Sequence, residues 1–262
     1  SLESLEKNSV KSPIFIIGFP RSGTTLLDTI LRSHPNIEVI EEKPLIDMIV
    51  AAIDRPISPG TLSALSSKQL TKLRKLYEEE SRRLVKPIKT GQIIIDKFPL
   101  NIIHIPVMHA LFPNGKYILV LRHPCDCVLS CFMQNFEPNE AMANFLNVKD
   151  TVTLYVNIMK LWSIYSEKLE LNVEIVKYEN LISNFEHTSK KILDFLDLEW
   201  NERLLKFFET GRARNKIMTP SYYQVTEKIY THATDRWQKY SKNLKTDISP
   251  LKPWLSYFSY ED

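Results

Sequence analysis

The segment from residue 14 to residue 31 constrains the fold more than any other part of the chain. Residues 14–18, IFIIG, form a run of β-branched and aromatic residues that is typical of a buried strand. Pro20 and Gly23 then indicate a turn, and apolar residues at 26, 27, 30 and 31 predict an amphipathic helix. Because such a junction directs backbone N–H groups and the positive end of a helix at one point, it predicts an anion site, to which Arg21 adds a charge.

The loop within this segment resembles a nucleotide-binding loop with one change. Gly18, Gly23 and Thr25 match the pattern G-x-x-x-x-G-K-[ST], but Thr24 stands where the pattern has lysine. In nucleoside triphosphatases that lysine reaches the β- and γ-phosphates, and the next hydroxyl group binds magnesium. A loop without the lysine is better suited to a nucleotide that has no γ-phosphate.

Length and composition indicate a soluble globular protein. The chain has 262 residues, of which 44% are hydrophobic and 25% charged, so it is long enough for one large domain. Its net charge of +3 is too small to favour nucleic acid or an anionic membrane. We find no signal peptide and no run of eighteen apolar residues, and we therefore expect a cytoplasmic protein without a membrane span. Residues 1–12 are expected to be a linker, and residues 13–262 a single domain.

The three cysteines lie within seven residues, at Cys125, Cys127 and Cys131, beside His123. An odd number of cysteines so close together is a poor disulfide framework and fits a reducing compartment. The spacing also allows a zinc site, but the pattern of an amphipathic helix favours small buried residues of the core.

Four segments have the apolar pattern that predicts a strand, and segments with helical patterns alternate with them. The strands are expected at 14–18, 92–96, 116–121 and 173–176, and further helices at 124 to about 136, from 150 onward and at 185–198. This alternation predicts an α/β fold, a P-loop-like three-layer arrangement with a central, mainly parallel sheet of four or five strands flanked by helices.

Residues 43–90, between the first two of these strands, are expected to form a helical insertion. A short helix is predicted within 45–53, and a longer one begins where Ser66 and Gln69 form a capping box. The pairs Glu78/Arg82 and Glu79/Arg83 fit a solvated helix face. We expect this insertion to form part of the wall on the acceptor side of a site.

Residues 20–26, PRSGTTL, resemble the loop that binds the 5′-phosphosulfate in sulfotransferases that use 3′-phosphoadenosine-5′-phosphosulfate (PAPS). The continuation SHPNIEVIEE is similar to the protein-tyrosine sulfotransferases and their bacterial relatives, which often carry tetratricopeptide repeats ahead of the catalytic domain. The resemblance extends over about residues 13–240. It implies PAPS as donor, adenosine 3′,5′-bisphosphate (PAP) as product and no required metal, and it allows for tetratricopeptide repeats upstream in the full-length protein. The implied donor contacts in the loop are Arg21, Ser22, Gly23, Thr24, Thr25 and Leu26.

Two further motifs support this resemblance. Residues 96–101, DKFPLN, resemble the motif D-K-x-P-x-N of the bacterial sulfotransferases. In those enzymes the lysine of the motif, which corresponds to Lys97, contacts the bridging region of the phosphosulfate. Arg122 and Ser130 match the pair that holds the 3′-phosphate in the family, a group that ATP lacks. Gln134 stands where the animal enzymes have a further arginine, so the grip on the ribose phosphate is expected to be weaker or to come from elsewhere.

The resemblance also assigns residues in the last third of the chain. Tyr178 is expected beside the adenine, with a buried structural tyrosine as the alternative. Residues 211–240 are similar to a loop that covers the nucleotide, with a solvated basic loop as the alternative. In that loop Ser221 matches a serine that stabilises the transition state, and Gln224, Tyr230 and Arg236 are the other implied nucleotide contacts.

Glu42 is the expected general base, because it follows Arg21 by the same separation as the catalytic glutamate of the protein-tyrosine enzymes. Together with Arg21, Lys97 and Ser221 it would move a sulfuryl group from PAPS to an acceptor hydroxyl by in-line transfer. Glu41 is the rival base, and His104 and His123 are weaker ones. Because Pro44 replaces an arginine that holds acidic peptides in the family, the acceptor stays open among peptide tyrosine, glycans, lipids and small molecules.

Two other functions compete with this one. A P-loop kinase or triphosphatase is supported by the glycines and by Asp96, which could serve as a Walker B residue, but Thr24 and the Arg122/Ser130 pair oppose it. A non-catalytic nucleotide-binding module is opposed by the presence of both Glu42 and Lys97, because binding alone needs neither a base nor a leaving-group clamp.

Overall fold

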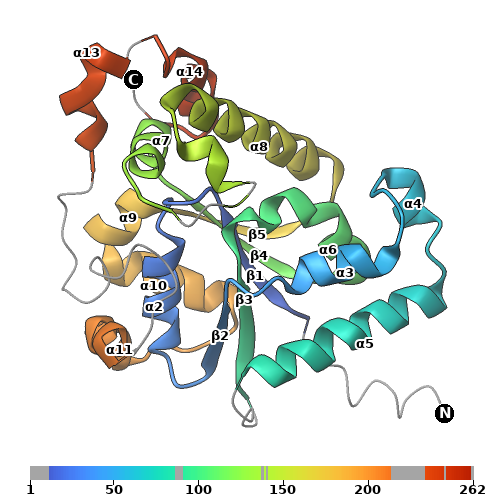
Figure 1. Cartoon of the computed structure of the whole chain (residues 1–262). Coiled ribbons are helices and arrows are strands. Elements are labelled where there is room, and N and C mark those ends of the chain that lie inside the picture. Colours follow the sequence, from blue (N-terminus) through green and yellow to red (C-terminus); the bar gives the residue numbers. More distant parts are fainter. Residues whose placement is uncertain are drawn as a thin grey trace.

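A five-stranded sheet, parallel throughout, forms the centre of the molecule (Figure 1). The computed structural model describes residues 12–85, 91–136, 139, 141–213, 234–244 and 246–260. The strand order is β2-β3-β1-β4-β5, with helices on both faces, which confirms the predicted α/β architecture. The strands are β1 (Ile14–Gly18), β2 (Ile37–Glu41), β3 (Ile93–Lys97), β4 (Lys116–Leu121) and β5 (Asn172–Lys177).

The edge strand β2 is the one that the sequence patterns did not reveal. Its five residues, IEVIE, include two glutamates, and they gain their hydrogen-bond partners only from β3. The helical insertion at 43–90 therefore follows the second strand rather than the first, which corrects its predicted place. The other four strands lie within about one residue of their predicted bounds.

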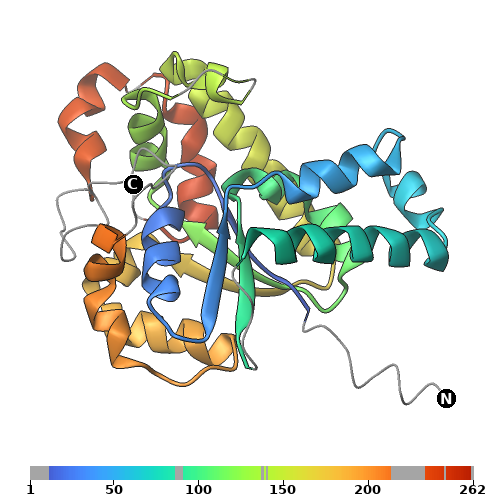
Figure 2. The ribbon, with the colours of Figure 1, turned by 60° about the horizontal axis from the view of Figure 1, so that its bottom comes forward.

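One face of the sheet packs against helices that follow the carboxyl ends of β1 and β5 (Figures 1 and 2). Ile16, Ile95 and Ile118 point into this core and are fully buried. Its helices are α2 (Thr24–Arg32), α9 (Tyr178–Ser183), α10 (Phe185–Phe195) and α11 (Phe207–Ala213).

The opposite face carries the larger core, which includes Phe15, Tyr117 and Leu119 of the sheet. The insertion covers the β3 side of this face and α8 the β4 side (Figure 1). The helices are α3 (Leu45–Ile53), α5 (Ser67–Leu84), α6 (Ile105–Leu111), α7 (Pro124–Phe132), α8 (Val148–Lys168) and α14 (Lys252–Tyr257). Shorter elements are α4 (Pro59–Ser63), α13 (Ser241–Leu244) and the 3-10 turns η1 (Pro99–His104), η2 (Met142–Phe145), η3 (Glu202–Lys206), η4 (Arg236–Tyr240) and η5 (Ser249–Leu251).

Helix ends and surface pairs test the finer predictions. The capping box of Ser66 and Gln69 is confirmed, and Glu78 pairs with Arg82 at 3.8 Å. The pair Glu79/Arg83 is wrong, because the Arg83 side chain reaches Glu80, one turn away at i−3. Helix α7 ends at residue 132 rather than near 136, and α10 ends at 195 rather than 198.

The three cysteines all lie in α7, where they are buried and form no disulfide bond within the described part of the chain, as is expected of small residues in an amphipathic helix. Among the described residues we find no helix that is long and apolar enough to cross a membrane.

Candidate active site

The predicted site residues gather at one edge of the sheet, because all five strands are parallel and end there. Strand β1 ends at Gly18, β3 ends at Lys97, β4 is followed by Arg122 and β5 by Tyr178. Ligands of open parallel sheets bind outside the carboxyl ends of the strands. Segments that are more than a hundred residues apart in sequence thus meet at the position where the loop predicts an anion.

The loop between β1 and α2 depends on close contacts that only glycine permits at two positions. A Cβ atom on Gly18 would lie 2.6 Å from the carbonyl oxygen of Val120. Gly23 has a φ of 106°, and a Cβ atom there would lie 2.7 Å from Cδ2 of Tyr178. Arg21 has a φ of 69°, a left-handed conformation that costs a non-glycine residue free energy. The loop is therefore held in one strained, specific shape.

The start of α2 has the features of an anion-binding site. Gly23 is the N-cap residue and offers no side chain to cap the helix. Thr24 and Thr25, in the first turn, are 3% and 5% exposed. Ser22 is 1% exposed, and its hydroxyl oxygen has no hydrogen-bond partner among the residues that the structure describes. A buried hydroxyl without a partner costs free energy, so this loop fits a ligand that supplies oxygen acceptors.

Two arginines and a serine link this loop to the end of β4. The Nε atom of Arg21 donates to Oγ of Ser130 at 3.1 Å. Nη1 of Arg122 donates to the carbonyl oxygen of Arg21 at 3.2 Å. The guanidinium of Arg122 also lies 5.1 Å from the ring centre of Tyr178. The structure thus brings together the residues predicted to bind the 5′ and 3′ ends of one nucleotide.

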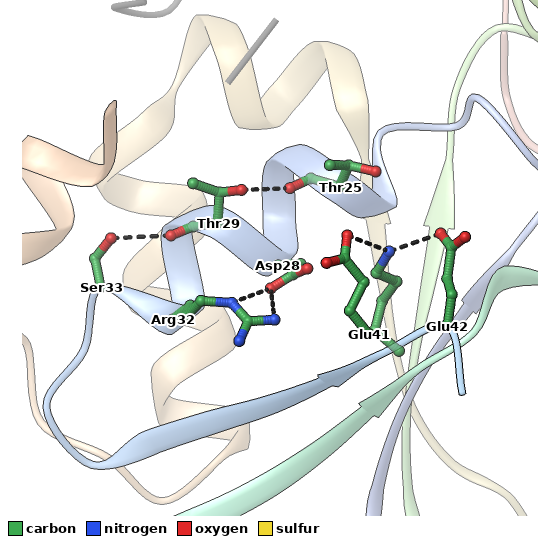
Figure 3. Close-up of polar contacts among 8 residues, drawn as sticks. Thr25, Asp28, Thr29, Arg32, Ser33, Glu41 and Glu42 are labelled. Atoms are coloured by element: carbon green, nitrogen blue, oxygen red, sulfur yellow. Dashed lines mark hydrogen bonds and ion pairs between the residues drawn. The ribbon is translucent and has the colours of Figure 1, made fainter. Parts of the chain in front are cut away.

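Lys97, the last residue of β3, is fully buried between the carboxylate of Glu41, which ends β2, and that of Glu42, which follows it. Its Nζ atom lies 2.7 Å from Oε1 of Glu42 and 3.3 Å from Oε1 of Glu41. Figure 3 shows both glutamate side chains reaching the same ammonium group. A buried ammonium group is stable only when it is paired, so the two carboxylates explain how Lys97 is tolerated there.

The two carboxylates converge because the backbone turns between them. Successive side chains of a strand point to opposite faces, so Glu41 and Glu42 would normally diverge. Glu42 instead has a φ of 47°, and its N–H donates to the carbonyl oxygen of Lys97 at 2.8 Å. The left-handed turn brings the Glu42 carboxylate to the face on which Glu41 and Lys97 already lie in register. Strain of this kind is common at functional sites.

Asp96 points to the other face of the sheet. Its Oδ2 atom accepts a hydrogen bond from the Tyr77 hydroxyl of α5 at 3.1 Å, and burial raises its pKa to about 7. Asp96 therefore contacts the insertion rather than the hydroxyl groups of the loop, which opposes its reading as a Walker B magnesium ligand.

Both histidines that could serve as a base are engaged in local structure. Nε2 of His104 lies 3.1 Å from Oδ1 of Asp47, which joins η1 to α3, and burial lowers the pKa of His104. His123 stacks on Trp237, with ring centres 5.2 Å apart and an angle of 11° between the planes.

Two acidic residues near Arg122 hold the C-terminal segment in place, and sequence reasoning missed them. Asp126 accepts the backbone N–H groups of Asp235 at 2.8 Å and Trp237 at 3.0 Å. Glu179 accepts the backbone N–H of His123 at 2.8 Å and the hydroxyl of Tyr260 at 2.9 Å. The sequence places Asp126 in the first turn of a predicted helix, which is a common position for an acidic residue. Its two partners could not be predicted, because they lie more than a hundred residues away in the chain.

Of the other residues predicted to contact the nucleotide, the structure describes three and leaves three outside the described residues. Leu26 and Tyr178 are both 8% exposed, and the Tyr178 ring packs against the loop and Arg122. Arg236 is exposed at the start of η4. The adenine contact of Tyr178 and the nucleotide contact of Arg236 stay predictions. Ser221, Gln224 and Tyr230 lie outside the described residues.

Comparison with known proteins assigns this arrangement to a class. A model of the sulfotransferase family matches residues 13–202, and the chain belongs to that family. Among curated relatives it is 28% identical over 255 residues to an uncharacterized protein of Aquifex aeolicus and 25% identical over 261 residues to protein-tyrosine sulfotransferase 1 of Danio rerio. These alignments cover 92% and 95% of this chain, but only 32% of the Aquifex protein and 72% of the Danio rerio protein.

Solved structures show the same fold. The sulfotransferase domain of the curacin biosynthetic pathway superimposes with a TM-score of 0.69 at 20% identity, covering 96% of this chain and 99% of that one. The sulfotransferase domain of the Synechococcus PCC 7002 olefin synthase gives 0.63 at 22% identity, covering 88% and 90%. A mouse sulfotransferase, SULT7A1, solved in complex with PAP, gives 0.55 at 20% identity, covering 96% and 89%. These likenesses confirm the fold, and the family model that matches residues 13–202 confirms the predicted class, a sulfotransferase.

Proposed function

We propose that this protein transfers the sulfuryl group of PAPS to an acceptor hydroxyl and releases PAP. The observation that carries the proposal is the junction of Arg21, Arg122 and Ser130 beside the start of α2. It combines a helix N-terminus for one phosphate with a second cationic group for another, as a nucleotide with 5′ and 3′ phosphates requires. The family assignment and the relatives named as protein-tyrosine sulfotransferases support the same reaction.

Each residue has a separate task in this proposal. Bound PAPS would supply an activated sulfuryl group that needs no metal to leave. The start of α2 and Arg21 would bind the phosphosulfate, while Arg122 and Ser130 would hold the 3′-phosphate. Lys97 would neutralise charge on the leaving phosphate. Glu42 is the proposed base because 27% of its side chain is exposed, against 10% for Glu41, so the acceptor reaches it more easily.

The test is calorimetric titration of the protein with PAP, beside a titration with ATP and magnesium. We expect PAP to bind and to raise the melting temperature, because a ligand at one hundred times its dissociation constant adds about 2.7 kcal/mol to stability. Turnover of ³⁵S-labelled PAPS against tyrosine peptides, phenols, glycans and lipids then identifies the acceptor. Binding of ATP with magnesium and not of PAP would overturn the proposal in favour of a kinase or triphosphatase.

The proposal places the insertion on the acceptor side of the site. Helix α3 begins at Leu45, three positions after Glu42, so the insertion lies beside the proposed base. It is the proposed acceptor wall. Tetratricopeptide repeats upstream are likewise a proposal for the whole protein, whose Aquifex relative is about three times as long as the part that matches.

A further inference from the structure

We propose that Glu41 is a positioning residue, which holds Lys97 so that Glu42 can act as the base. This inference rests on the proposed function and extends it to a residue that the proposed mechanism does not use. It starts from a conflict in the site. The carboxylate nearest to Lys97 belongs to Glu42, at 2.7 Å, and Glu42 is also the group that has to accept the acceptor's proton.

The first step of the argument concerns the charge of Lys97. The side chain is 0% exposed, so its ammonium group cannot rely on water. If Glu42 were its sole partner, protonation of Glu42 during the reaction would leave a buried cation unpaired at the moment when the leaving phosphate needs it in place. A second carboxylate that keeps its charge throughout removes this penalty.

The second step concerns geometry. Glu41 and Lys97 are register partners on the adjacent strands β2 and β3, and both point to the face that carries α2. Glu41 therefore holds the ammonium group from the rigid part of the sheet, whereas Glu42 reaches it through a left-handed turn after the strand ends. A side chain on a strand within a sheet is oriented more precisely than one on a turn. A catalytic group such as Lys97 needs a precisely oriented partner.

The third step concerns donor capacity. A lysine ammonium group has three N–H donors. Among the residues that the structure describes, Glu41 and Glu42 account for two of them, so a third can reach an oxygen of the leaving phosphate. Two fixed partners determine the direction of the third N–H, so the loss of Glu41 would leave Lys97 turning about its contact with Glu42.

The geometry can be tested without a nucleotide. Lysine ammonium groups that are buried and ion-paired exchange their protons slowly and give ¹H–¹⁵N correlation signals, whereas exposed ones do not. We expect one such signal from Lys97, identified by its absence in Lys97→Met, and its loss or broadening in Glu41→Gln. Glu38→Gln is the matched control, because it removes a carboxylate from the same strand where none of the described contacts joins it to Lys97.

The role is tested by kinetics in a double-mutant cycle with PAPS and the acceptor found in the screen. We expect Glu41→Gln to lower kcat at least tenfold, since a small misplacement of a catalytic group costs about that much or more, with KM for PAPS within about twofold. In the Lys97→Met background the same change should alter kcat less than twofold, because Glu41 acts through Lys97. Glu41→Asp, which keeps the charge, should recover part of the loss.

The outcomes separate the two proposals. An unchanged kcat in Glu41→Gln, or an equal loss in the Lys97→Met background, would overturn the positioning role. A retained Lys97 signal in a folded Glu41→Gln protein would overturn it as well. If the wild-type protein neither binds PAP nor uses PAPS, the proposed function fails, while the spectra still report whether Glu41 holds Lys97.

Discussion

The Nε atom of Arg21 donates a hydrogen bond to Oγ of Ser130 at 3.1 Å, although the two residues are 109 positions apart. The bond joins the loop after β1 to helix α7, which follows β4. It places the guanidinium of the loop proposed to bind the phosphosulfate against the hydroxyl of a residue proposed to bind the 3′-phosphate. The hydrogen bond therefore couples the two elements directly.

The proposed role of Arg122 predicts that the protein distinguishes PAP from AMP, because AMP lacks the 3′-phosphate that this arginine would hold. Arg122→Met should weaken PAP binding about 10- to 100-fold, because a hydrogen bond to a charged group is worth about 1.5–3 kcal/mol. Binding of AMP should change much less. Calorimetry with both nucleotides measures the ratio. Arg82→Met is the control, since that arginine lies 59% exposed on α5. Equal losses for both nucleotides would show that Arg122 does not bind the 3′-phosphate.

Removal of the proposed base should separate binding from turnover. Glu42→Gln is expected to bind PAP at least as tightly as the wild type, because it removes a negative charge next to the site. Its turnover of PAPS should fall by about 10²- to 10⁴-fold, the usual contribution of a positioned base. Steady-state assays with the acceptor found in the screen measure this loss. Turnover like that of the wild type would remove Glu42 from the mechanism.

The loop should not tolerate a side chain at its second glycine. Gly23→Ala forces a left-handed φ on alanine and places Cβ 2.7 Å from the Tyr178 ring, so we expect a loss of about 1–3 kcal/mol in the free energy of unfolding and weaker PAP binding. Urea titration measures the first effect. Gly60→Ala is the control, because the nearest atom to its Cβ would be Oγ of Ser58 at 3.8 Å. Adding Tyr178→Ala should relieve the contact but not the backbone cost.

Asp96 should make the stability depend on pH. Burial raises its pKa from 3.8 to about 7 in the folded protein, so the native state holds this proton more tightly than the unfolded chain. Its contribution to stability is therefore complete below pH 3.8 and is lost as the pH rises toward about 7.

The substitution Asp96→Asn tests this dependence. The amide keeps an oxygen that can accept from Tyr77 and cannot ionise, so the variant should lack this pH dependence. At pH 8 it should be more stable than the wild type by roughly 1–3 kcal/mol. Urea unfolding across pH 4–8 is the measurement. Parallel curves for the two proteins would show that Asp96 does not titrate in this range.

Local sequence patterns are enough to predict the class of fold and the strand-loop-helix unit at residues 14–32. The strands β1 and β4 and the helix α2 follow from local apolar patterns, and the glycines of the loop mark backbone shapes that other residues adopt only with strain. These features depend on neighbours in the chain, so they can be read from it. The resemblance to sulfotransferases rests on ordered motifs in the chain, and the family model that matches residues 13–202 confirms the family.

Tertiary structure decided the parts that depend on distant partners. Strand β2 forms because β3 completes its hydrogen bonds, and five residues that include two glutamates are too short a segment to predict it without that partner. The convergence of Glu41 and Glu42 on Lys97 needs both the strand register and one left-handed residue. Asp126 finds its partners in residues 235 and 237 only when the chain returns to α7. Long-range hydrogen bonds and buried charges leave no periodic trace in a sequence, because their partners are set by the packing of whole elements.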